Sequence, residues 1–156
     1  MFLRNLEDVR ALFSSLGRTF AGTVITAYSR ILPVHFIHPY HIICLRRTCD
    51  LPTLRKDTPV FCLEEELGRP VWQEGYNSFD LLADPSTQQF LRSLPGPKCL
   101  FLYQSYPQLE TLAGKKGWEL VANPAALRLN VSSRAFFQNM VHRLNLPDLP
   151  GGIYPL

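Results

Sequence analysis

The sequence predicts one α/β domain built around a mostly parallel sheet of about four strands, with helices on its faces. Short apolar runs alternate along the chain with amphipathic segments of helical period, and this alternation is typical of a parallel sheet that is covered on both sides. The length of 156 residues and the hydrophobic content of 46% suit one core better than two.

The expected strands are apolar without interruption, as strands buried on both faces usually are, and turn-forming residues flank them. They span residues 41–45, 59–63, 98–103 and 118–122. We expect residues 41–45 to be the first strand of the sheet. A short crossover at residues 50–56 joins it to the second, which favours parallel pairing of the two. Together these features predict a Rossmann-like sheet.

The amino-terminal part of the chain is predicted to be helical. Asn5 is a suitable N-cap, and Gly17 is well placed to end the first helix in the left-handed conformation. Residues 18–32 repeat their apolar positions at helical spacing, although the Thr and Val residues in this segment favour a strand. We therefore predict an amino-terminal helical extension over residues 1–33.

Further helices are expected between and after the strands. Ser86 is the expected cap of one that runs to about Leu94, and Pro107 marks the start of the next. Ser132 is the expected cap of the last helix, which ends before Pro147. We therefore expect residues 34–147 to form the α/β domain and residues 148–156 to begin a linker.

Composition and charge exclude several classes of function. The formal net charge is +3 and the basic residues are scattered, whereas nucleic-acid binders gather them on one face. No apolar stretch reaches the length of about 18 residues that a membrane span needs, and no cleavable leader is evident, so we expect a cytoplasmic protein. Charged residues make up only 19% of the chain, which favours an apolar surface for a partner. The acidic run at residues 64–66 is interpreted as a solvated turn.

The chain offers no complete set of catalytic or metal-binding residues. Its four cysteines lack the paired spacing of zinc sites and are expected to be free thiols, mostly buried. His35, His38 and His41 recur at a spacing of three, but Pro39 makes a helix there unfavourable, so we expect no metal site. No catalytic residue is assigned.

Ligands of Rossmann-like sheets bind outside the carboxyl ends of the strands. The polar residues that follow the predicted strands are therefore candidates for substrate binding, namely Gln104, Ser105 and Asn123. The same residue types also serve as turn and cap residues, which is the alternative role for all three. The chain has neither a G-x-G-x-x-G nor a P-loop motif, so a complete phosphate cradle is not expected.

The carboxyl-terminal part resembles a known family. Residues 118–124 are expected to form a strand followed by a polar turn, and residues 126–137 a helical segment. Residues 144–147 are expected to form the turn that leads out of the last helix. This pattern resembles the segment that leads into the ATP-grasp ligases, and Ser133-Arg134 matches the position of an Asp-Lys pair in that family. The order of the preceding elements is similar to the family's amino-terminal pre-ATP-grasp domain.

The resemblance implies one part of an ATP-dependent carboxylate-amine ligase that is not catalytic alone. ATP and magnesium would be cofactors of the full-length protein and would not bind this chain tightly. Arg134 would contact the nucleotide, and the partners would be a carboxyl-terminal ATP-grasp domain and a small carboxylate substrate. A second copy of the chain in a homodimer is a further partner to consider. Two alternatives stay open, a stand-alone α/β protein-interaction module and a small enzyme that uses Cys or His.

Overall fold

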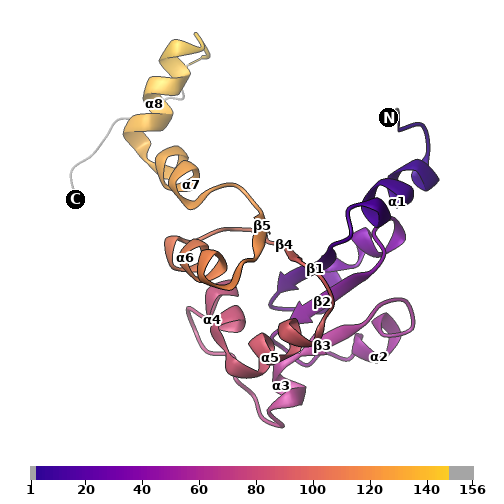
Figure 1. Cartoon of the computed structure of the whole chain (residues 1–156). Coiled ribbons are helices and arrows are strands. Elements are labelled where there is room, and N and C mark those ends of the chain that lie inside the picture. Colours follow the sequence, from indigo (N-terminus) through magenta and orange to yellow (C-terminus); the bar gives the residue numbers. More distant parts are fainter. Residues whose placement is uncertain (1–2, 148–156) are drawn as a thin grey trace. The chain divides into compact units, whose positions relative to one another are not determined.

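The computed structural model describes residues 3–147 and contains a five-stranded sheet with helices packed against it (Figure 1). All neighbouring strands are parallel, and their order is β3-β2-β1-β4-β5. The strands are β1 (Thr19–Val24), β2 (Tyr40–Cys44), β3 (Val60–Cys62), β4 (Lys98–Phe101) and β5 (Glu119–Val121). The predicted α/β class, the Rossmann-like sheet and the parallel pairing are therefore confirmed, with one strand more than expected.

The contacts divide the chain into two compact units, with the boundary after Ala122. The first holds the sheet together with short 3-10 turns and six helices in its described part. These are α1 (Leu6–Ser15), η1 (Ala27–Arg30), η2 (Leu32–His35), α2 (Leu51–Leu54), α3 (Leu63–Glu66), α4 (Ser78–Ala83), α5 (Pro85–Ser93) and α6 (Pro107–Lys116). The second unit holds α7 (Ala125–Ser132) and α8 (Arg134–Arg143). The linker predicted at residues 148–156 lies outside the described part of the chain.

The helix predicted over residues 18–32 is wrong. Residues 19–24 form β1, which is the central strand and pairs with β2 on one edge and with β4 on the other. Five of its six residues are buried, so the β-branched Thr and Val side chains prevail over the helical spacing of the apolar positions. Residues 1–33 are therefore not a separate helical extension, and the boundary expected at residue 33 falls inside the first unit.

Both faces of the sheet carry a hydrophobic core. Phe20 and Ile42 point into one cluster of buried side chains, and their neighbours Ala21 and Ile43 point into the other. This alternation is the period of two that a strand imposes on its side chains. No helix within residues 3–147 has the length and apolar content needed to cross a bilayer.

Several predicted helix ends are confirmed. The Asn5 side chain accepts a hydrogen bond from the amide of Asp8 at the start of α1, and Gly17 follows the helix with a φ of 60°. Pro107 is the first residue of α6, as predicted. In the structure the same helix ends at Gly117, whose φ is 67°. Both glycines adopt the left-handed conformation, which is unfavourable for residues with a side chain.

Two predicted caps are displaced. Asp84, and not Ser86, caps α5, because Pro85 takes the first helical position and leaves the preceding carboxylate to accept from the amide of Ser86 at 2.8 Å. Ser132 is the last residue of α7, and the adjacent Ser133 caps α8.

The centre of β1 requires a residue without a side chain. A Cβ atom on Gly22 would overlap the hydroxyl oxygen of Tyr40 and would lie 3.1 Å from the Cζ atom of that ring and from the Cβ of Arg30. The Tyr40 hydroxyl is buried and has no hydrogen-bond partner within residues 3–147. Burial raises the pKa of this phenol to about 12, against the opposing charge of Arg30.

We expect Gly22→Ala to lower the free energy of unfolding by about 2 kcal/mol or more, because the new methyl group overlaps a packed ring. Tyr40→Phe should change it by less than about 0.5 kcal/mol, since the hydroxyl that it removes is buried without a partner. The double variant should recover most of the loss, and chemical denaturation of all four proteins measures this. Equal destabilisation of the single Gly22→Ala and the double variant would contradict the packing described.

Candidate functional site

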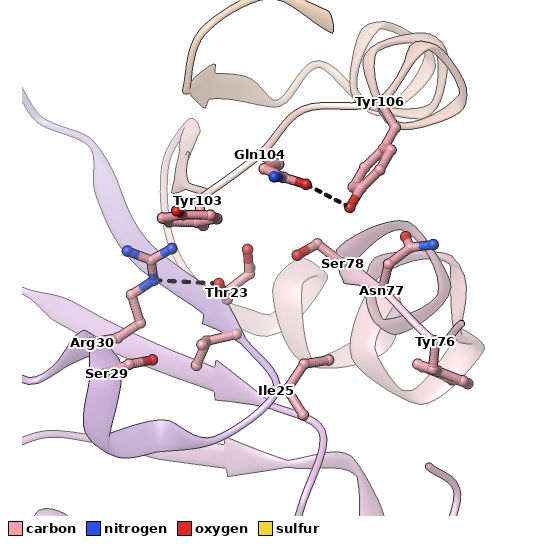
Figure 2. Close-up of a pocket in the computed structure, with 11 residues that line it drawn as sticks. Thr23, Ile25, Ser29, Arg30, Tyr76, Asn77, Ser78, Tyr103, Gln104 and Tyr106 are labelled. Carbon is pink, nitrogen blue, oxygen red and sulfur yellow. Dashed lines mark hydrogen bonds between the residues drawn. The ribbon is translucent and has the colours of Figure 1, made fainter. Parts of the chain in front are cut away.

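The strand order reverses between β1 and β4, which gives the sheet a topological switch point at their carboxyl ends. Ligands of open α/β sheets bind in the crevice at this point. Here the crevice holds a pocket of about 360 Å³, which lies within the range of about 300–1,000 Å³ that is usual for small-molecule sites. Its lining comes from the end of β1, from η1, from the start of α4 and from the loop after β4 (Figure 2). The lining residues are Thr23, Val24, Ile25, Ser29, Arg30, Tyr76, Asn77, Ser78, Tyr103, Gln104 and Tyr106.

Arg30 is the only charged side chain in this lining. Its Nε donates a hydrogen bond of 3.4 Å to the backbone oxygen of Thr23, whereas its two terminal nitrogens have no partner within residues 3–147. No acidic side chain forms an ion pair with it in the same part of the chain. The pocket is therefore positive at this point, and the guanidinium group retains donors for an anion.

The base of the pocket combines apolar and fixed polar groups. Val24 and Ile25 at the end of β1 contribute aliphatic surface. The Thr23 hydroxyl is buried and donates to the backbone oxygen of Phe101 at 3.3 Å. This bond ties the end of β1 to the end of β4 and helps to fix the geometry of the crevice.

The loop after β4 provides the opposite wall. The Tyr106 hydroxyl donates to the Oε1 atom of Gln104 at 3.0 Å (Figure 2), so the side-chain amide group of Gln104 still has its own donors. Tyr103 precedes this pair and is 85% exposed. The wall is therefore rich in aromatic surface and carries a side-chain amide at its centre.

The start of α4 closes the third side. The side chain of Asn77 already has partners near the start of α4. It accepts a hydrogen bond from the amide of Phe79 at 2.8 Å and donates one to the backbone oxygen of Gly75 at 3.4 Å. The hydroxyl of Ser78 makes no hydrogen bond within residues 3–147. Burial raises the pKa of Tyr76, and the nearby carboxylates of α4 and its end add to the shift, so this phenol stays neutral at physiological pH.

Glu64 anchors the loop that leads to this third side. One of its oxygens accepts from the amide of Arg47 at 2.9 Å, and the other accepts from the amides of Val71 at 3.1 Å and Trp72 at 3.3 Å. Burial pushes the pKa of Glu64 upward, but the three amides and the charge of Arg46 outweigh it and lower the pKa. The interpretation of residues 64–66 as a solvated turn is wrong, because these residues belong to α3 and only Glu66 is exposed. The charge pattern alone does not reveal the backbone partners of Glu64.

The structure brings only one of the predicted substrate-binding residues into the pocket. Gln104 lines it, whereas Ser105 is buried beside it and donates to the carboxylate of Glu110 at 3.0 Å. Asn123 and Arg134 are exposed and belong to the second unit. Arg134 is the first residue of α8.

No sequence pattern points to the residues that give the pocket its character, namely Arg30, Tyr76, Tyr103 and Tyr106. The spacing of residues 18–32 predicts a helix in place of β1, so it gives no expectation of a strand end near Arg30. Tyr103 falls inside the strand predicted over residues 98–103, whereas β4 ends at Phe101, so this side chain lies in the loop at the strand end. Tyr106 follows the predicted strand, and the rule that ligands bind at strand ends applies to aromatic rings as well as to polar neighbours.

The described residues do not form a metal site. Within residues 3–147, no group of three or more His, Cys, Asp or Glu side chains is arranged to hold a metal ion. All four cysteines are free thiols, as predicted, and Cys44, Cys62 and Cys99 are buried. Cys44 lies opposite Cys62 in the β2–β3 pairing, and the hydrogen bond that its thiol donates toward Cys62, together with burial, raises the pKa of Cys44.

Comparison with known protein families, with curated proteins and with solved structures gave no match for this chain. The geometry and chemistry of the switch-point pocket are therefore the basis for the function proposed below.

We expect Glu64→Gln to lower the free energy of unfolding by about 1–2 kcal/mol near neutral pH, because a charged acceptor of three amides becomes neutral. The pKa of Glu64 is lowered in the folded protein, so its contribution is present above the usual carboxyl pKa and is lost as the pH falls through the lowered value. The deficit of the variant should therefore shrink between about pH 7 and about pH 3, as followed by urea denaturation.

Glu66→Gln is the matched control, because Glu66 is an exposed neighbour on the same helix. A deficit of equal size for both variants, or one for Glu64→Gln that does not change with pH, would contradict the anchoring role.

Proposed function

We propose that the first unit is the carboxylate-binding domain of an ATP-dependent carboxylate-amine ligase of the ATP-grasp type, and that it does not catalyse the reaction alone. The observation that carries the proposal is Arg30, a guanidinium group with free donors at the switch point of the sheet. A planar guanidinium group matches a carboxylate in two parallel hydrogen bonds, which makes arginine well suited to this ligand.

The pocket suits a carboxylate better than a nucleotide. The segment that follows β1 contains no glycine, and η1 is a single 3-10 turn of four residues. It therefore lacks the glycine-rich turn and the long helix with which nucleotide-binding sheets hold a diphosphate. A single guanidinium group is matched in charge to one carboxylate.

In this proposal ATP and magnesium bind to the ATP-grasp domain of the full-length protein. ATP would supply the phosphoryl group that activates the bound carboxylate for attack by an amine. The residues described here do not fit a magnesium site, so we assign none of them to the metal. Arg134, exposed at the start of α8, is the one residue of this chain for which we propose a nucleotide contact.

A second candidate function is a protein-interaction module, and the second unit supports it. Its helices and the segment that follows α8 expose several large apolar side chains, and exposed apolar surface of this kind often marks an interface. These residues are Leu127, Leu129, Val131, Phe136, Phe137, Leu144 and Leu146.

For the proposed function, we expect the chain to bind small organic acids such as benzoate and hexanoate, measured by calorimetry or by NMR titration. Arg30→Ala should weaken binding about 10-fold to 100-fold, because it removes a charge-assisted pair of hydrogen bonds. The affinity of Arg30→Lys should lie between those of the wild-type protein and Arg30→Ala, because lysine keeps the positive charge but lacks the planar guanidinium group. Magnesium-ATP should bind weakly at most.

Arg92→Ala serves as the control, because Arg92 is exposed on α5 and outside the pocket. Binding of the acids that is insensitive to Arg30, or a tight complex with magnesium-ATP, would rule out the proposed assignment of the pocket.

The interaction module predicts a different result. We expect sedimentation to show a concentration-dependent dimer that Phe137→Asp dissociates, because a charge is costly in an apolar interface. Gln108→Asp, which adds the same charge at an exposed position of α6 in the first unit, is the control. A monomer at every concentration would contradict association of the chain with itself.

A further inference from the structure

We infer that the ligand of the switch-point pocket is an aromatic carboxylate, with its acid group on Arg30 and its ring against Tyr103. This inference rests on the proposed function and adds the chemical class of the substrate. It is drawn from the tyrosine side chains of the pocket, which the binding of a carboxylate alone does not require.

Aromatic surface is concentrated around the site. Three of the eleven lining residues are tyrosines, namely Tyr76, Tyr103 and Tyr106. Tyr103 has an exposed fraction of 85%, so little of its ring is used in packing the protein itself. Aromatic rings stack with one another at an offset or edge to face, which gives a ligand ring a favourable partner at such a position.

The arrangement places the two recognition groups together. Figure 2 shows the ring of Tyr103 and the guanidinium group of Arg30 at the same end of the pocket, with Ile25 at its base. A ligand ring between Tyr103 and the aliphatic side chains of Val24 and Ile25 would hold its acid group within reach of Arg30. The ring then contacts apolar surface on both faces, as is usual for small-molecule sites.

Two further polar side chains of the lining can bond to the edge of a ligand ring. Gln104 has free amide donors because its oxygen is bonded to Tyr106, and Ser78 has a hydroxyl without a partner within residues 3–147. Both can bond to a ring nitrogen or to a hydroxyl substituent. The volume of about 360 Å³ is enough for a single-ring acid and lies near the lower end of the usual range for ligand pockets.

The test compares benzoate with cyclohexanecarboxylate, which has the same charge and nearly the same size but a saturated ring. We expect the chain to bind benzoate about 3-fold to 10-fold more tightly in calorimetry, because only the flat ring can stack on tyrosine. Tyr103→Leu should abolish this preference and leave the affinity for cyclohexanecarboxylate nearly unchanged. Arg30→Ala should weaken the binding of both acids.

Tyr28→Leu is the matched control, since Tyr28 is another exposed tyrosine, on the same 3-10 turn as Arg30, that does not line the pocket. Equal affinities for the two acids, with dependence on Arg30 retained, would overturn the aromatic preference and leave the proposed function standing. No binding of either acid would overturn both. A preference for benzoate that survives Tyr103→Leu would overturn the role of Tyr103 as the stacking partner.

Discussion

The structure of the first unit depends on the burial of β1 at the centre of the sheet. This strand has a hydrogen-bonded neighbour on each edge and a hydrophobic core on each face. Such a position excludes water from the strand on all sides, and at Gly22 it leaves no room for a side chain beside Tyr40. Because the chain builds the sheet outward from β1 in both directions, the crevice must open at the carboxyl ends of β1 and β4.

The pocket in this crevice combines rigid support with an unsatisfied charge. Thr23 joins the two strand ends, and Glu64 holds the loop that leads toward Tyr76 through the amides of Val71 and Trp72. Arg30, by contrast, keeps most of its donors free within the described residues. Rigid pocket walls around one cationic group with free donors are the arrangement expected of a site that binds and orients an anion. The chemistry that we propose for the whole ligase would then be supplied by groups outside this unit.

Four strands can be predicted from the sequence, because strands buried on both faces appear as continuous apolar runs. Turn-forming residues mark where each run begins and ends. It does not reveal β1, in which Ala21 and Gly22 are weak strand formers and the apolar residues also fit a helix. The same error hid Arg30, since the end of an unrecognised strand gives no expectation of a ligand site. Gln104 was found because β4 was recognised. Backbone partners such as those of Glu64 depend on tertiary contacts that no local pattern encodes.

The most direct test of this account is the location of a bound acid, mapped by the change in backbone NMR signals as benzoate is added. The account predicts that the largest changes occur at the carboxyl ends of β1 and β4, in the amides of Ile25, Arg30 and Gln104. Changes confined to α7 and α8, or to the edge strand β3, would show that the acid binds elsewhere and would contradict the assignment of the switch-point pocket.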